Sequence, residues 1–167
     1  GESLRPEFGN IPVSFIPLAN RRLYTYQIET MRSAFPERSI MMTIPVNYNL
    51  SEAEHNWMDD NGVDLIQLDK VESYGQELYE LLSADIYQNQ EITFLLGSCL
   101  SLEIPKDIDF IGTFETNMEP PMPVDTYGAE NDIVWAGIFS VSKPALLQDC
   151  LKNEFFEYSR AIKRYSF

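Results

Sequence analysis

The acidic side chains of this chain are concentrated in its middle part. Residues 49–132 contain nineteen Asp and Glu residues but only two basic ones, Lys70 and Lys106. The flanking segments are close to neutral, with four acidic and five basic residues in 1–48 and three and five in 133–167. Like charges three or four residues apart on a helix repel one another. Helices formed by the middle segment therefore lose some stability, which indicates that their negative field has a use.

The overall charge narrows the classes of function. The formal net charge is −14 and the sequence pI is about 4.3. A protein that binds nucleic acid directly needs clustered Lys and Arg to displace counterions from the phosphates. A strongly negative surface instead attracts a positively charged protein and speeds its association. We therefore expect a basic protein partner and no direct contact with nucleic acid.

Length and composition favour a globular chain. With 167 residues, 44% of them apolar, the chain most simply forms a single domain, residues 1–167, that buries its own core. No apolar run approaches the roughly 20 residues that a helix needs to cross a bilayer. The first residues show no basic region followed by an apolar one, so we expect no signal peptide, no membrane binding and a cytoplasmic location.

Periodicity and turn residues predict the elements of the first half. Residues 11–18 are expected to form a strand bracketed by prolines, and residues 22–28 a strand that pairs with it as a hairpin. A helix over 29–35 competes with this second strand. Further strands are expected at 39–46 and 63–68.

A helix is predicted between these last two strands. Ser51 is its expected N-cap and Glu54 the capping-box partner, while Leu50 is placed for a hydrophobic staple. The helix should end near Asp60, because Asn61-Gly62 is typical of a helix C-terminus.

The second half is predicted to contain two more helices and several strands. Ser73 is expected to cap a helix over 74–88, and Ser142 a long helix that runs to Tyr165 with Pro144 in its first turn. Residues 92–104 are expected to form one bent strand or two strands with a break at Gly97, and further strands are expected at 107–114 and 133–141. Residues 115–132, with three prolines and five acidic residues, are expected to form a long acidic loop.

These elements predict an α+β fold. The order strand, helix, strand, helix, strand from 39 to 96 permits parallel pairing, whereas the hairpins on either side favour antiparallel pairing. We therefore expect one domain with a mixed or antiparallel sheet of about five or six strands, packed against three helices.

Candidate catalytic residues are few. His55 is the only histidine, so a nucleophilic site would have to pair it with Cys99, Cys150 or Ser98. The segment Gly97-Ser98-Cys99-Leu100-Ser101 follows a strand but lacks the spacing of a nucleophile elbow. Cys99 and Cys150 lie among leucines, which favours two buried reduced thiols over a disulfide. A small hydrolase or transferase that uses Cys99 or Ser98 with His55 is therefore an alternative to a binding protein.

Neither a metal site nor a cofactor site is predicted. One histidine and two cysteines in apolar surroundings cannot form a structural zinc site. Asp59-Asp60-Asn61-Gly62 resembles part of a calcium loop, but Trp57 and Leu68 would then occupy ligand positions one and twelve. The sequence also contains no glycine-rich phosphate loop.

The remaining signal is the acidic surface. We predict a non-catalytic protein that occludes a basic site on a partner, as an inhibitor, an immunity-type protein or a mimic of nucleic acid does. The partner could be a nuclease, a toxin or a nucleic-acid-binding protein. A structural or assembly subunit that forms a homodimer is a further alternative. The predicted contacts are one aromatic anchor and nine carboxylates, namely Trp57, Glu52, Glu54, Asp59, Asp60, Glu77, Glu80, Asp85, Glu119 and Asp125.

Overall fold

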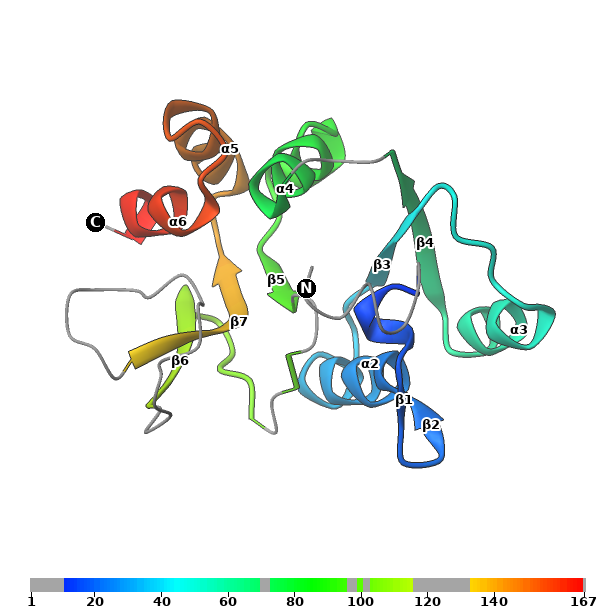
Figure 1. The fold of residues 1–167 in the computed structure, drawn as a ribbon. Helices are drawn as coiled ribbons and strands as arrows, with labels where there is room; N and C mark the ends of the chain where they lie inside the picture. The colour runs from blue at the N-terminus through cyan, green and yellow to red at the C-terminus, as the bar shows by residue number, and fades with distance from the viewer. Residues whose placement is uncertain (1–10, 70–72, 96–98, 101–102, 116–132, 167) are drawn as a thin grey trace, which may run out of the picture. The chain divides into compact units, whose positions relative to one another are not determined.

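The structure, a computed structural model, describes residues 11–69, 73–95, 99–100, 103–115 and 133–166 (Figure 1). This part of the chain is a mixed α+β fold with five α-helices and three small sheets of two, two and three strands. The α+β class is confirmed, but the single sheet of five or six strands is wrong. The strands instead divide between two compact units, Gly1–Lys70 with Gly97–Lys106 (unit 1) and Val71–Leu96 with Asp107–Phe167 (unit 2). Each unit is described by itself below, and the single domain over 1–167 stays a prediction.

Unit 1 begins with a short hairpin and a helix. Strands β1 (Pro17–Leu18) and β2 (Arg21–Arg22) pair antiparallel, after the 3-10 turn η2 (Val13–Phe15), and α2 (Leu23–Ala34) follows at once. The predicted hairpin thus exists only as a two-residue ladder, and the predicted strand over 22–28 is wrong. The competing helix is confirmed and starts six residues earlier than expected, because Leu23, Gln27 and Ile28 follow helical spacing and are buried together.

A parallel β-α-β unit forms the rest of unit 1. Strands β3 (Ile40–Pro45) and β4 (Val63–Leu68) pair parallel, with Ile40 opposite Val63, and α3 (Glu52–Asp60) connects them. Both strands and the helix were predicted at nearly these bounds. The capping box is confirmed, and the chain leaves α3 at Gly62, whose φ of 59° suits a residue without a β-carbon.

One face of this two-stranded sheet builds the core of unit 1. Its buried residues are Phe15, Tyr24, Ile28, Ile40, Ile44, Met58 and Val63, which come from η2, α2, both strands and α3. The ring of Phe15 lies 4.8 Å from those of Tyr24 and Tyr48, and Tyr24 packs edge-on against Trp57 at 5.2 Å. These ring contacts connect the loop after β3, which contains Tyr48, with α2 and α3.

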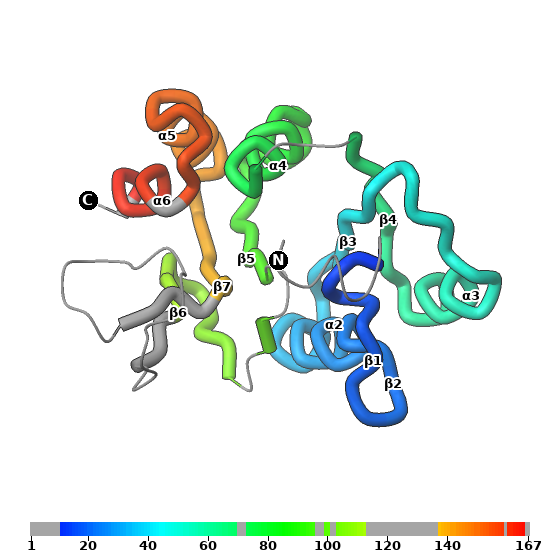
Figure 2. Tube along the Cα trace, viewed as in Figure 1, coloured from blue at the N-terminus to red at the C-terminus, as the bar shows by residue number. Residues whose placement is uncertain are grey.

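Unit 2 contains an antiparallel sheet and three helices (Figure 2). The strand order is β5-β7-β6, with β5 (Ile92–Leu95) and β6 (Phe110–Glu115) on either side of β7 (Ile133–Val141). Strand β7 has the predicted bounds. The strand predicted over 92–104 is shorter, because residues 99–100 and 103–106 have no regular structure.

Helix α4 (Tyr74–Leu82) is shorter than predicted. Ser73 accepts a hydrogen bond from the Gln76 amide and so caps the helix as expected. The helix ends at Leu82 rather than at Gln88, and the separate 3-10 turn η3 (Asp85–Tyr87) follows. Leu78 and Leu82 of α4 and Tyr87 of η3 are buried, so both elements contribute apolar side chains to the core of unit 2.

The predicted C-terminal helix is two helices, α5 (Pro144–Asn153) and α6 (Tyr158–Ser166), which pack against each other. The amides of Phe155 and Phe156 donate to the carbonyls of Lys152 and Leu151, and both phenylalanines have positive φ. This is the Schellman pattern that ends a helix. Ser142 is not the cap, because the cap position is Lys143 and the Ser142 hydroxyl donates to Asp109.

Candidate functional site

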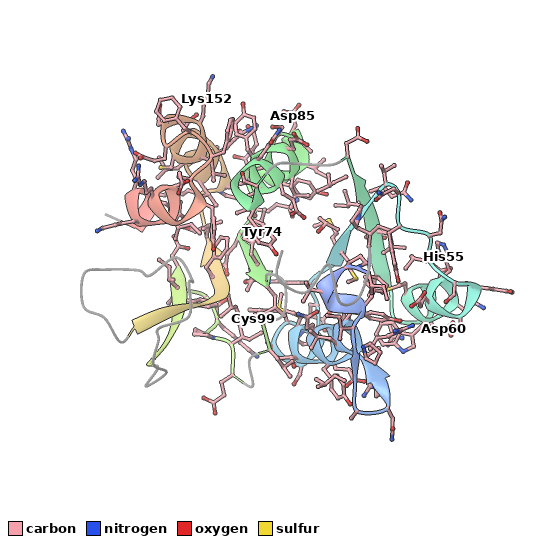
Figure 3. All side chains as sticks on the ribbon, viewed as in Figure 1. His55, Asp60, Tyr74, Asp85, Cys99 and Lys152 are labelled. Atoms are coloured by element: carbon pink, nitrogen blue, oxygen red, sulfur yellow. The ribbon has the colours of Figure 1, made fainter. Side chains whose placement is uncertain are left out.

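Helix α3 carries four of the carboxylates that were predicted as partner contacts. Glu52, Asp59 and Asp60 are exposed, and none of them lies within ion-pair distance of a cation in the described part of the chain. Residues 52 and 59 are seven apart, so they lie on one stripe of the helix with His55 between them. Figure 3 shows His55 and Asp60 on this helix. The structure therefore gives unit 1 an exposed acidic stripe.

Glu54 does not belong to this stripe. Only 9% of the residue is exposed, and its Oε2 accepts hydrogen bonds from the Ser51 amide and hydroxyl at 2.9 and 2.7 Å. Its Oε1 is buried 3.5 Å from Arg22 Nε. Burial, with a further contribution from the Glu54 charge, raises the pKa of both Tyr24 and Tyr48. Glu54 thus holds α3 to the core of unit 1 and offers no surface to a partner.

The predicted aromatic anchor is also engaged within the unit. Trp57 is half-buried, and its ring packs edge-on against Tyr24 at a centroid distance of 5.2 Å. Its carbonyl accepts a hydrogen bond from the Asn61 side chain at 2.8 Å. The indole therefore supports the packing of α3 on α2.

The acidic residues of unit 2 form a separate group. Glu80 and Asp85 are exposed, while Glu77 is half-buried in the first turn of α4. Glu80 accepts a hydrogen bond from Gln76 at 3.1 Å. Figure 3 labels Tyr74 and Asp85, which mark the beginning of α4 and the η3 turn beyond its end. The prediction that these residues join the α3 stripe in one patch stays a prediction, since they belong to the other unit.

Two predicted contacts, Glu119 and Asp125, lie outside the described residues. The same holds for most of the predicted acidic loop over 115–132, of which only Glu115 is described, as the last residue of β6.

His55 lines a cavity of about 340 Å³ in unit 1. The cavity lies beside the last residues of β3 and β4, and the loop between β3 and α3 contributes Tyr48 and Asn49 to it. Gln67 of β4 also lines it. The sequence analysis missed Tyr48, Asn49 and Gln67. The signal that could have found them is the strand-helix-strand order, because ligands bind outside the carboxyl ends of parallel strands.

The arrangement of the thiols gives a catalytic pair little support. Ser98 lies outside the described residues, and Cys99 does not line the cavity that contains His55. Burial raises the pKa of the Cys99 thiol, which disfavours the reactive thiolate. The Cys99 carbonyl accepts a hydrogen bond from Gln27 at 2.8 Å. Both cysteines are free, with Cys150 buried and Cys99 half-buried.

Within residues 11–69, 73–95, 99–100, 103–115 and 133–166, no group of three or more His, Cys, Asp or Glu side chains could hold a metal ion. Of the helices that the structure describes, none has both the length and the apolar character to cross a bilayer.

Comparison with known protein families, curated proteins and solved structures gave no significant match. The chemistry of the described surface therefore carries the functional argument.

Proposed function

We propose that this chain is a non-catalytic binding protein whose acidic surface occludes a basic site on a partner protein, as an inhibitor, immunity-type protein or nucleic-acid mimic does. The supporting observation is the exposed stripe of Glu52, Asp59 and Asp60 on α3, which has no cationic partner among the described residues. Asp59 and Asp60 lie in the last turn of α3, where the helix dipole disfavours negative charge. A cationic partner that balances these acidic charges in the complex would account for their presence on α3.

Three arginines of unit 1 make contacts other than ion pairs with the stripe. Arg21 pairs with Glu29, and Arg22 lies against the buried Glu54. Arg32 donates to the carbonyls of Asn61 and Gly62 at the end of α3. The exposed stripe therefore keeps its negative field, which steers a basic partner to it.

Charge reversal with a matched control tests this proposal. The probe is fluorescent poly-lysine, titrated at low and at physiological ionic strength. The test variant is Glu52→Lys/Asp59→Lys/Asp60→Lys, and the control is Glu37→Lys/Asp64→Lys/Asp149→Lys, which changes the net charge equally at three exposed positions outside α3. Glu54 stays unchanged in both, because a lysine at this buried position would unfold α3.

The expected result is a loss of at least about tenfold in affinity for the test variant and a smaller loss for the control, with binding that weakens as salt is added. Equal losses in both variants would show that net charge alone attracts the probe, and would overturn the assignment of α3. Circular dichroism of both variants checks that they are folded.

The cytoplasmic location belongs to this proposal as an expectation. The enzyme that uses Cys99 or Ser98 with His55 and the homodimeric assembly subunit stay predictions, and no contact of the described residues favours either.

A further inference from the structure

The cavity of about 340 Å³ beside α3 has an apolar wall and a polar rim. Ile44, Leu50 and Leu65 supply the apolar wall. Such a wall is favourable for an apolar group that leaves water, and a concave site of this size can surround one large side chain.

The rim offers hydrogen-bonding groups. Tyr48 supplies a phenol, Asn49 and Gln67 supply amides, and His55 supplies an imidazole. Amides and hydroxyls can both donate and accept, so they suit the main chain of a peptide laid across the mouth of the cavity.

Negative charge lies on the α3 side of this rim. His55 stands between Glu52 and Asp59, at spacings of three and four residues, on the exposed stripe of α3. Glu54 is buried beneath the same helix, and its charge acts on Tyr48. Anionic ligands are therefore repelled. The Ser51 and Glu54 amides at the start of α3 are already bonded within the capping box.

From this geometry we propose, on the basis of the function proposed above, that the cavity seats one large apolar side chain of the basic partner, presented on a segment with Lys or Arg on both sides. The apolar side chain enters between Leu50 and Leu65, and the flanking cations meet Glu52 and Asp59. The cavity thus adds selectivity to an attraction that charge alone would leave unspecific.

Two peptide probes separate the contribution of the apolar side chain from that of the flanking charges. Each is a short lysine peptide that differs only at its centre, with phenylalanine in one and glycine in the other, and their affinities are measured at the same salt concentration. The unmodified protein should bind the phenylalanine peptide about tenfold more tightly, because the ring leaves water.

Variants of the cavity test where this preference comes from. Gln67→Trp, at an exposed position of β4, should fill the cavity and abolish the preference, so that the two peptides bind with equal affinity. Asn49→Trp fills it from the loop and serves if Gln67→Trp fails to fold. The matched control, Glu52→Gln/Asp59→Gln, should weaken both peptides by the same factor and keep the preference.

The outcomes distinguish this inference from the proposed function. Equal binding of the two peptides by the unmodified protein, or a preference that survives both tryptophan variants, would overturn the inference. If charge reversal on α3 still removed binding, the proposed function would stand. If charge reversal left both peptides bound as before, the proposed function would fail instead.

Discussion

Glu54 shows how one carboxylate can be structural while its neighbours remain in solvent. It completes the capping box with Ser51 and lies against Arg22, so its replacement removes both contacts. We expect Glu54→Ala to lower the free energy of unfolding by about 1–2 kcal/mol. Glu52→Ala, at an exposed position two residues away, should change it by less than about 0.5 kcal/mol. Urea denaturation of the two variants measures the difference, and equal losses would refute the structural role of Glu54.

Phe155 is an aromatic residue in a conformation that favours glycine. Its φ is 53°, it occupies the position after the cap of α5, and 88% of its surface is exposed. The left-handed region costs a residue with a β-carbon roughly 1 kcal/mol or more. We therefore expect Phe155→Gly to raise the free energy of unfolding by about 0.5–1 kcal/mol, because it relieves this strain and removes no buried contact.

Phe156 is the control for this change. It also has positive φ, but it is half-buried, with its ring 5.2 Å from that of Tyr79. Phe156→Gly should lower the free energy of unfolding by at least about 1 kcal/mol, because the lost apolar contact outweighs the relieved strain. Thermal denaturation compares the two variants. A loss of stability in Phe155→Gly would show that the exposed ring has a contact in the folded chain.

At the scale of elements, close packing between α4 and the turn after α5 depends on one glycine. A β-carbon added at Gly75 would overlap the carbonyl group of Phe156. We expect Gly75→Ala to lower the free energy of unfolding by about 1–3 kcal/mol, since backbone atoms cannot move aside as a side chain can. The comparison variant is Gly62→Ala, where the added atom meets nothing closer than 3.7 Å and only positive φ opposes it. A smaller effect at Gly75 than at Gly62 would contradict this packing.

The elements that the sequence predicted well are those determined by local signals. Ser51, Glu54 and Gly62 mark both ends of α3 through contacts within a few residues. The element over 22–28 was predicted as a strand because polar and apolar residues alternate there. Its true partners, Phe15 and Met58, lie elsewhere in the chain, and burial against them made it helical. The break at Phe155 was missed because phenylalanine gives no sign of a left-handed residue.

For the whole molecule, strand pairing and the candidate site depended on contacts far apart in the sequence. β3, β4 and β7 were predicted near their observed bounds and β5 and β6 in part, yet nothing local shows that β3 pairs with β4 or that β5 and β6 both pair with β7. The acidic character of α3 was predictable from composition. The sequence did not predict that Glu54 is buried or that Gln67 and His55 line the same cavity. Both features follow from the way α3 packs on the sheet.

The net charge of −14 also affects the stability of the whole chain. Excess charge of one sign opposes the compact state, and the described ion pairs that are largely exposed, such as Arg21–Glu29, contribute little. Screening acts over about 30 Å at 0.01 M salt and about 8 Å at 0.15 M, so added salt weakens the repulsion. We therefore expect the free energy of unfolding to rise by about 1 kcal/mol over this range, a shift of about 2–4 °C in Tm. Glu52→Lys/Asp59→Lys/Asp60→Lys should respond less, because it carries less excess charge. A Tm that falls as salt is added would mean that ion pairs outweigh the repulsion in the folded chain.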